Sequence, residues 1–355
     1  MSFYLSAGEW RHSMVNCIKI IRSLLEISAI LAMPAAIPAF AATQSDNAAG
    51  LVRVNALAYH LQTASQGLCK SPILITGVML HDLGAYGKAE RPGIAAQYGL
   101  GNGFGVAQVV AGSPAARAGL KPNDEIVALN GVDVRNFQSG LIRQKASYDR
   151  VEAFTSFLRE GLTAGHVVLD VKRGEAQVQV DLAGQPACGG RAFLVHSDVL
   201  NAWSDGKYVA ITDRMYALAE DDSELAFVLA HEMAHIILGH EQQLRESSKL
   251  FAELGLGGGK FKRAEIEADV MAVRIMMSAG LDMSAPERFL RRAAGLRPFD
   301  LATTHPGISR RIRIVNDTMA EIEAARIASA QPVLASAAEH ELHGAPRPPA
   351  SKRAR

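Results

Sequence analysis

The chain has 355 residues, with an apolar fraction of 48% and a charged fraction of 21%, which are ordinary values for soluble globular proteins. This length favours two domains over one or four. The formal net charge is +1 and the sparse aromatic residues are not interleaved with Lys or Arg, so the composition argues against a nucleic-acid partner.

Residues 1–41 are predicted to be a secretory signal peptide. Basic residues such as Lys19 precede an apolar run over residues 28–39, and an Ala-Phe-Ala cleavage signature ends at Ala41. The alternative is an uncleaved anchor in the inner membrane, but two prolines interrupt the run, which is short for a span of about 20 apolar residues. We therefore expect a periplasmic or otherwise exported protein that contacts a membrane only through this leader.

Residues 42–72 are expected to form a helical segment, because Leu51, Val54, Leu57 and Leu61 follow a helical spacing. The next unit, residues 73–188, contains strand signals and glycine-rich turns. Its composition predicts a small β-rich domain.

Part of this unit resembles a bacterial PDZ domain of the kind found in periplasmic proteases. The resemblance is clearest over residues 105–131, which suggest a strand, a Ser-Pro turn, a short helix and a second strand that ends in Asn-Gly. It implies that Ile75, Thr76, Gly77 and Val78 form the loop that holds a peptide carboxylate through backbone N–H groups. The following strand would then pair with the peptide.

Cys69 and Cys188 flank the β-rich unit, and the third cysteine, Cys17, lies in the leader. An even pair in an exported protein favours a disulfide, which would hold the two ends of the unit together. Two buried free thiols are the alternative.

The strongest functional signal is His231-Glu232-Met-Ala-His235, in a largely apolar stretch with helical periodicity. Residues four apart share a helix face, so His231 and His235 can bind one zinc ion while Glu232 takes a proton from a water molecule. A capping box formed by Asp221 and Glu224 is predicted at the start of this helix.

A catalytic zinc site needs a third protein ligand. The segment from Arg263 to Asp269 also has helical character, and Glu265 and Asp269 lie on one face of it. We expect Glu265 to be the third ligand and Asp269 to orient a ligand histidine. Glu267 is the alternative ligand if the helix register differs. His240 is a poor ligand candidate and is interpreted as a helix-end histidine.

These residues resemble the HtpX and CAAX-prenyl-protease family of gluzincin metallopeptidases over about residues 195–320. The shared motifs are, in chain order, Asn201-Ala202 with Ile211-Thr212, the H-E-x-x-H at 231–235, Glu265 with Asp269, His305-Pro306, and Arg311-Ile312.

The resemblance implies roles for residues that the spacing alone does not assign. Asn201 and Ala202 would begin a strand beside the cleft that pairs with extended substrate. His305 would lie near the zinc, either stabilising the tetrahedral intermediate or occupying the open metal position; an exposed loop histidine is the alternative. Arg311 would pair with a carboxylate of the site or remain solvated.

Together these features predict an α+β protein in which a mainly helical zincin-type domain, residues 189–328, follows the PDZ-like domain. It would be a zinc metalloendopeptidase that binds one Zn²⁺ and cleaves exported proteins, with a PDZ domain that selects or gates substrates. Envelope protein quality control is implied by resemblance. A non-catalytic PDZ adaptor or chaperone with a structural zinc is the alternative. Residues 329–355, Ala-rich and then Pro-rich and basic, are expected to be disordered.

Overall fold

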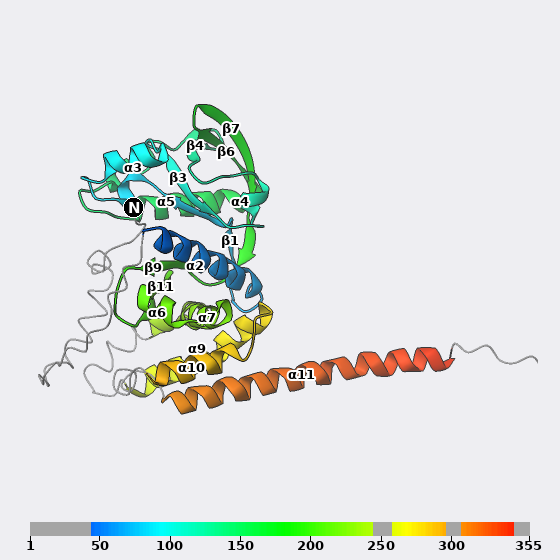
Figure 1. Cartoon of the computed structure of the whole chain (residues 1–355). Helices are drawn as coiled ribbons and strands as arrows, with labels where there is room; N and C mark the ends of the chain where they lie inside the picture. Colours follow the sequence, from blue (N-terminus) through cyan, green and yellow to red (C-terminus); the bar gives the residue numbers. More distant parts are fainter. Residues whose placement is uncertain (1–43, 244–257, 296–306, 344–355) are drawn as a thin grey trace, which may run out of the picture.

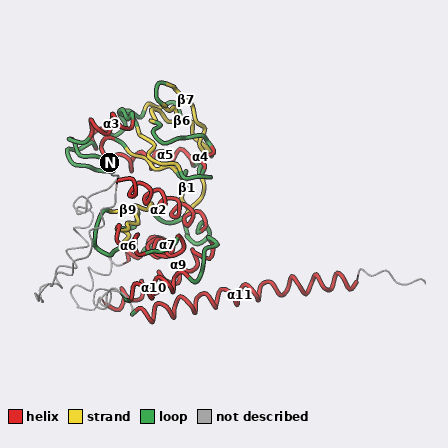
Figure 2. The backbone as a smooth tube through the Cα atoms, in the orientation of Figure 1, coloured by secondary structure: helices red, strands yellow, loops and turns green. Residues whose placement is uncertain are grey.

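The computed structural model describes residues 44–243, 258–295 and 307–343. An antiparallel sheet with its helices forms one part of the molecule, and a helical part lies on the other side of helix α2, Gln44–Ala64 (Figure 1). The strands concentrate in the first part and the long helices in the second (Figure 2). The predicted α+β class, with the β-rich part first, is confirmed.

The β-rich part is built on a six-stranded antiparallel sheet of order β2-β3-β4-β6-β7, with β5 paired to β4. Its strands are β2 (Val78–His81), β3 (Phe104–Val109), β4 (Glu125–Leu129), β5 (Val132–Asp133), β6 (His166–Arg173) and β7 (Ala176–Ala183). Alternating residues of β6 are buried, as expected for a sheet with one covered face. A separate antiparallel pair joins β1 (Ile73–Ile75) to β8 (Gln185–Ala187).

Helix α5, Asp149–Leu162, covers this sheet. Its buried residues join the sheet's core, where the rings of Phe154 and Phe104 stack with centroids 3.9 Å apart. The neighbouring Arg150 is 1% exposed and its guanidinium donates to the carboxylate of Asp82 and to five backbone carbonyls. The shorter helices are η1 (Leu83–Ala85), α3 (Arg91–Tyr98), α4 (Pro114–Arg117) and η2 (Ser139–Leu141).

The helical part has a three-stranded sheet of order β10-β11-β9, in which β10 is antiparallel to β11 and β9 is parallel to it. Its elements are β9 (Arg191–Val195), β10 (Ala202–Ser204), β11 (Tyr208–Thr212), α6 (Asp213–Leu218), α7 (Asp222–Leu238), α9 (Gly258–Ser278), α10 (Ala285–Ala294) and α11 (Ile308–His343). The core forms around α7, which is buried along most of its length.

Helix α2 packs against the helical part although it precedes the β-rich part in sequence. Leu51, Val54 and Leu61, from the predicted helical pattern, are buried in the same core as α7, and Leu57 packs against it. Asn55 donates to the side chain of Gln108 in β3, so α2 contacts both parts.

Cys69 and Cys188 form a disulfide with their Cα atoms 5.9 Å apart. Cys69 follows α2 and Cys188 follows β8, so the bond closes a loop that contains the whole six-stranded sheet. We expect the Cys69→Ser/Cys188→Ser variant to lose about 2–5 kcal/mol of unfolding free energy, because its unfolded chain is less constrained. Urea denaturation of the variant, and of the parent with and without reductant, measures this loss. Equal midpoints under all conditions would contradict it.

The C-terminal helix is longer than the sequence suggested. The composition of residues 329–355 predicts disorder, whereas α11 continues to His343. The alanine and glutamate content of this stretch favours helix even without an apolar stripe. No described helix combines the length and hydropathy needed to cross a membrane.

Candidate metal centre

Helix α7 supplies most of the site, and its ends are defined by its own sequence. Asp221 is the N-cap, with its side chain accepting from the backbone N–H of Glu224 at 2.8 Å. The Glu224 carboxylate accepts in turn from the N–H of Glu220 at 2.9 Å, one residue before the expected capping-box position. The helix ends at Gly239, whose φ of 68° is the left-handed conformation that favours glycine.

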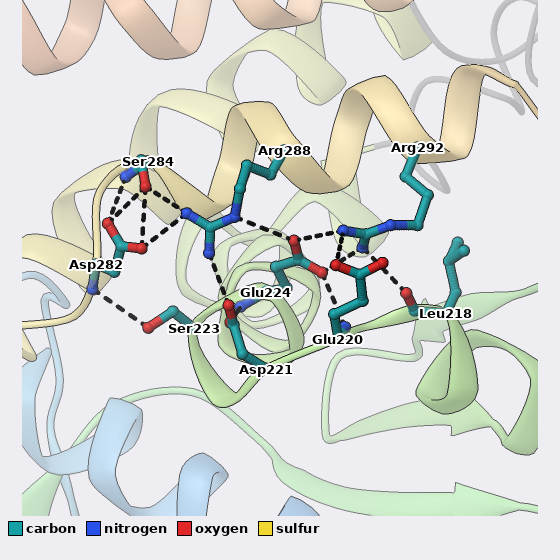
Figure 3. A network of polar contacts seen from close by, with 9 residues as sticks. All are labelled: Leu218, Glu220, Asp221, Ser223, Glu224, Asp282, Ser284, Arg288 and Arg292. Carbon is teal, nitrogen blue, oxygen red and sulfur yellow. Dashed lines mark hydrogen bonds and ion pairs between the residues drawn. The ribbon is translucent and has the colours of Figure 1, made fainter.

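The start of α7 is also fixed by α10. In Figure 3, Arg288 and Arg292 project from α10 towards the carboxylates at the N-terminus of α7. Arg288 donates to Asp221 at 2.7 Å, and Arg292 donates to Glu224 at 3.0 Å. Glu224 is buried, so its charge depends on these arginines. The network holds the metal-site helix in a fixed position relative to α10.

His231, His235 and Glu265 come together as a possible metal-binding group. The Nε2 atoms of the two histidines lie 3.3 Å apart, and the carboxylate oxygens of Glu265 lie 3.2 Å from His231 Nε2 and 3.5 Å from His235 Nε2. One ligand atom from each residue fits within 4.8 Å of the others. Two imidazole nitrogens and one carboxylate are the donor set of catalytic zinc sites that keep a fourth position open, so these residues fit the ion.

Glu265 reaches this group from α9, which packs directly against α7. Glu267, the alternative ligand, lies on another face of α9 and pairs with Arg263 at 2.8 Å. The structure therefore places Glu265, and not Glu267, beside the two histidines. Glu232 is half-buried on the same turn of α7 as the histidines.

Asp269 lies one turn beyond Glu265 and is fully buried. Its carboxylate is 3.0 Å from His231 Nδ1 and accepts two hydrogen bonds from Arg311 of α11, at 2.6 and 2.9 Å. Arg311 is therefore buried and paired with a carboxylate of the site, and it is not solvated. Burial raises the pKa of Asp269, but the charge and hydrogen bonds of Arg311, followed by the bond with His231, lower it to about 2. Asp269 is therefore an ionised acceptor that can orient His231.

His240 holds the other ligand histidine, a role that the sequence did not reveal. Because Gly239 ends the helix, His240 lies outside α7 and folds back, with its Nδ1 atom 2.9 Å from Nδ1 of His235. Its Nε2 atom is 3.3 Å from the carboxylate of Glu267. His240 thus directly follows the end of α7, as the sequence predicted, and in addition it contacts His235 and Glu267. In the sequence, the signal for this turn is Gly239, because glycine favours the left-handed conformation that ends a helix.

Strand β10 lies at the edge of its sheet and contacts α7. Asn201 precedes it and is fixed by Thr212, whose N–H and hydroxyl both donate to the Asn201 carbonyl, at 3.1 and 2.9 Å. Ala202 begins the strand and pairs with Ile211. The two residues are thus at a sheet edge near the metal-site helix.

Ile75, Thr76, Gly77 and Val78 form the connection from β1 to β2. Gly77 has a φ of 73°, and a Cβ atom there would lie 2.3 Å from Cβ of Ser113, so only glycine fits. All four residues line one groove. His305 lies outside the described residues, and its role stays a prediction.

Comparison with known proteins agrees with both halves of this description. Residues 105–145 match the PDZ domain and residues 173–261 match Peptidase family M48. The second match includes His231 to His235 and stops before Glu265, so the third ligand rests on geometry.

Two curated relatives carry the name beta-barrel assembly-enhancing protease. The Vibrio cholerae protein is 28% identical and the Yersinia pestis protein 26% identical, each over 151 aligned residues that cover 32% of this chain and 31% of the relative. This chain thus spans about a third of the length of these relatives. Among solved structures, a peptide-bound HtrA3 PDZ domain is 20% identical, with a TM-score of 0.24, and covers 33% of this chain and 89% of that one. The HtrA-type protease AlgW with a decapeptide is 22% identical, with a TM-score of 0.21 and coverages of 32% and 30%.

Proposed function

We propose that this chain, which joins a PDZ domain to a Peptidase M48 domain, is a zinc metalloendopeptidase that cleaves exported proteins in the bacterial envelope. The observation that carries the proposal is the convergence of His231, His235 and Glu265 into one metal-binding group, with Glu232 next to His231 on the same helix. The names of the two relatives, which describe proteases that enhance β-barrel assembly, support an envelope location.

In this mechanism His231, His235 and Glu265 hold the zinc ion, and a bound zinc supplies Lewis acidity that makes water a nucleophile near neutral pH. Glu232 accepts the proton of the attacking water and passes it to the leaving amine. Asp269 and His240 fix the orientation of the two histidine rings. An extended substrate pairs with the β10 edge at Asn201 and Ala202, next to this helix. His305 is proposed to stabilise the developing negative charge.

The rival hypothesis is a non-catalytic adaptor with a structural zinc. Structural zinc sites are usually closed by four protein ligands and are rich in cysteine. The metal group found among the described residues has three ligands, and the cysteines described are joined to each other. This donor set favours the catalytic hypothesis.

Metal removal tests the proposal. We expect the purified protein to contain about one zinc per chain, to cleave an unfolded protein such as casein, and to lose this activity to 1,10-phenanthroline and regain it with added Zn²⁺. The Glu265→Gln variant should lose both zinc and activity, whereas Glu175→Gln, on an exposed turn, should keep both. Zinc without cleavage would favour the adaptor. Cleavage that survives complete removal of the metal would overturn the proposal.

A further inference from the structure

The β-rich part and the helical part touch where the first turn of α5 meets strand β9. Tyr148 is the N-cap residue of α5, and Glu152 lies one turn later, with its N–H donating to the Tyr148 carbonyl at 2.9 Å. Arg191 and Phe193 lie two positions apart on β9 and therefore share one face of the three-stranded sheet. One helix face thus meets one strand face across the junction between the two parts.

Two pairs of side chains make this contact. Glu152 forms an ion pair with Arg191, and their side chains are 28% and 27% exposed. The rings of Tyr148 and Phe193 meet edge to face with centroids 5.9 Å apart. Tyr208 of β11 joins the two pairs, since its ring centroid lies 5.3 Å from that of Phe193 and 5.4 Å from the guanidinium of Arg191. Burial lowers the pKa of the Arg191 guanidinium, so its charge is costly without an anionic partner.

The contacted face of the sheet continues to the edge strand beside the metal centre. Phe193 is paired with Ala210 of β11, and Ala210 is paired with Trp203 of β10. Side chains at paired positions lie on the same face, so these three residues form one row across the three strands. Phe193 and Ala210 are 7% and 1% exposed, so the row is closely packed. Tyr148 therefore packs at one end of a row whose other end is on β10.

The start of β9 also lies against the metal-site helix, one residue before Arg191. A Cβ atom at Gly190 would lie 2.3 Å from the carbonyl oxygen of Lys207 and 2.5 Å from Cδ1 of Ile236, so there is no room for a methyl group. Ile236 follows the ligand residue His235 on α7. Because no slack separates β9 from α7, the position of β9 determines where the sheet lies relative to the metal-site helix.

We propose that Tyr148 and Glu152 are positioning residues for substrate cleavage, because they hold β9, and through it the β10 edge, in a fixed place relative to the metal ligands. The inference rests on the function proposed above and gives the PDZ domain a specific part in it. A substrate paired with β10 must place its scissile carbonyl at the metal centre, and a displacement of about 1 Å can cost about 100-fold in rate. The three metal ligands are on α7 and α9, so loss of the contact should slow cleavage without removing zinc.

The test places two cations opposite each other in the full chain carrying Trp10→Phe, so that Trp203 on β10 is the only tryptophan. Trp203 is half-buried and its indole N–H has no acceptor among the described residues, so its fluorescence emission responds to exposure of β10. With Glu152→Arg we expect emission at longer wavelength and a fall of about tenfold or more in kcat for casein cleavage. Zinc content and far-UV circular dichroism should stay those of the parent. The double variant Glu152→Arg with Arg191→Glu restores an ion pair and should recover part of both losses. Glu160→Arg, the same change at an exposed position of α5, should alter neither quantity.

The outcomes separate positioning from folding and from the proposed activity. Unchanged emission and kcat in Glu152→Arg overturn the proposal, as does a loss that the double variant does not recover or that accompanies lost zinc or lost helix. Shifted emission with full kcat shows that β10 moved without affecting cleavage, and also overturns it. If the parent cleaves nothing, the proposed function fails, whereas the Trp203 emission still decides whether the contact holds β10. If Glu152→Arg does not fold, Glu152→Gln removes the same charge from a side chain of the same shape and is judged by the same measurements.

Discussion

Replacing Glu232 with glutamine is expected to reduce peptide hydrolysis by about 100- to 10,000-fold while the protein keeps its zinc. Glutamine has nearly the same shape as glutamate but cannot accept the proton of the attacking water. The metal should remain because its three ligands, His231, His235 and Glu265, are unchanged. Zinc content and casein cleavage, measured on the same preparation, separate the two effects.

The matched comparison is Glu265→Gln, which makes the same chemical change one helix away. It should lose zinc and activity together, whereas Glu232→Gln should lose activity alone. If Glu232→Gln loses its zinc, Glu232 is a ligand and the assignment of the proton acceptor is wrong. If it keeps full activity, another group accepts the proton.

Replacing Arg311 with methionine is expected to lower the unfolding free energy by about 3–5 kcal/mol and zinc affinity by about 10- to 100-fold. The change leaves the carboxylate of Asp269 buried without its cation. It also removes the hydrogen bonds that hold the Asp269 carboxylate in place beside His231. Urea denaturation and zinc competition with a chelator measure the two losses.

The neighbouring Arg310→Met variant is the control, because Arg310 is exposed on the same helix turn. It should change neither quantity. A second variant, Asp269→Leu with Arg311→Met, should recover part of the stability by removing both charges. A fully stable Arg311→Met protein would show that the pair does not stabilise the helical part.

The pair of Asp269 and Arg311 should make the unfolding free energy depend on pH in the acid range. Folding lowers the pKa of Asp269 to about 2, below the value of about 3.9 for an unfolded chain. Its stabilisation is therefore present above about pH 4 and is lost as the pH falls towards 2. This dependence should be smaller in the doubly substituted protein.

Much of the metal centre could be predicted from the sequence because its parts are local. A spacing of four residues on a helix brings His231 next to His235 and Glu265 above Asp269, whatever the rest of the fold does. The Asp221 cap is a contact over three residues. Cysteine parity and export likewise suggested the pair Cys69 and Cys188, although only the folded chain brings the two sulfur atoms together.

The remaining features depend on packing between distant segments. Arg311 meets Asp269 across 42 positions of sequence, and His240 meets Glu267 across 27, so no periodicity could indicate either contact. The groove lined by Ile75 to Val78 also has residues of α2 and α7 in its walls, because α2, from the start of the chain, packs on the helical part. Helix spacing fixed which side chains share a face, and burial of apolar surface among α2, α7, α9 and α11 decided what those faces meet.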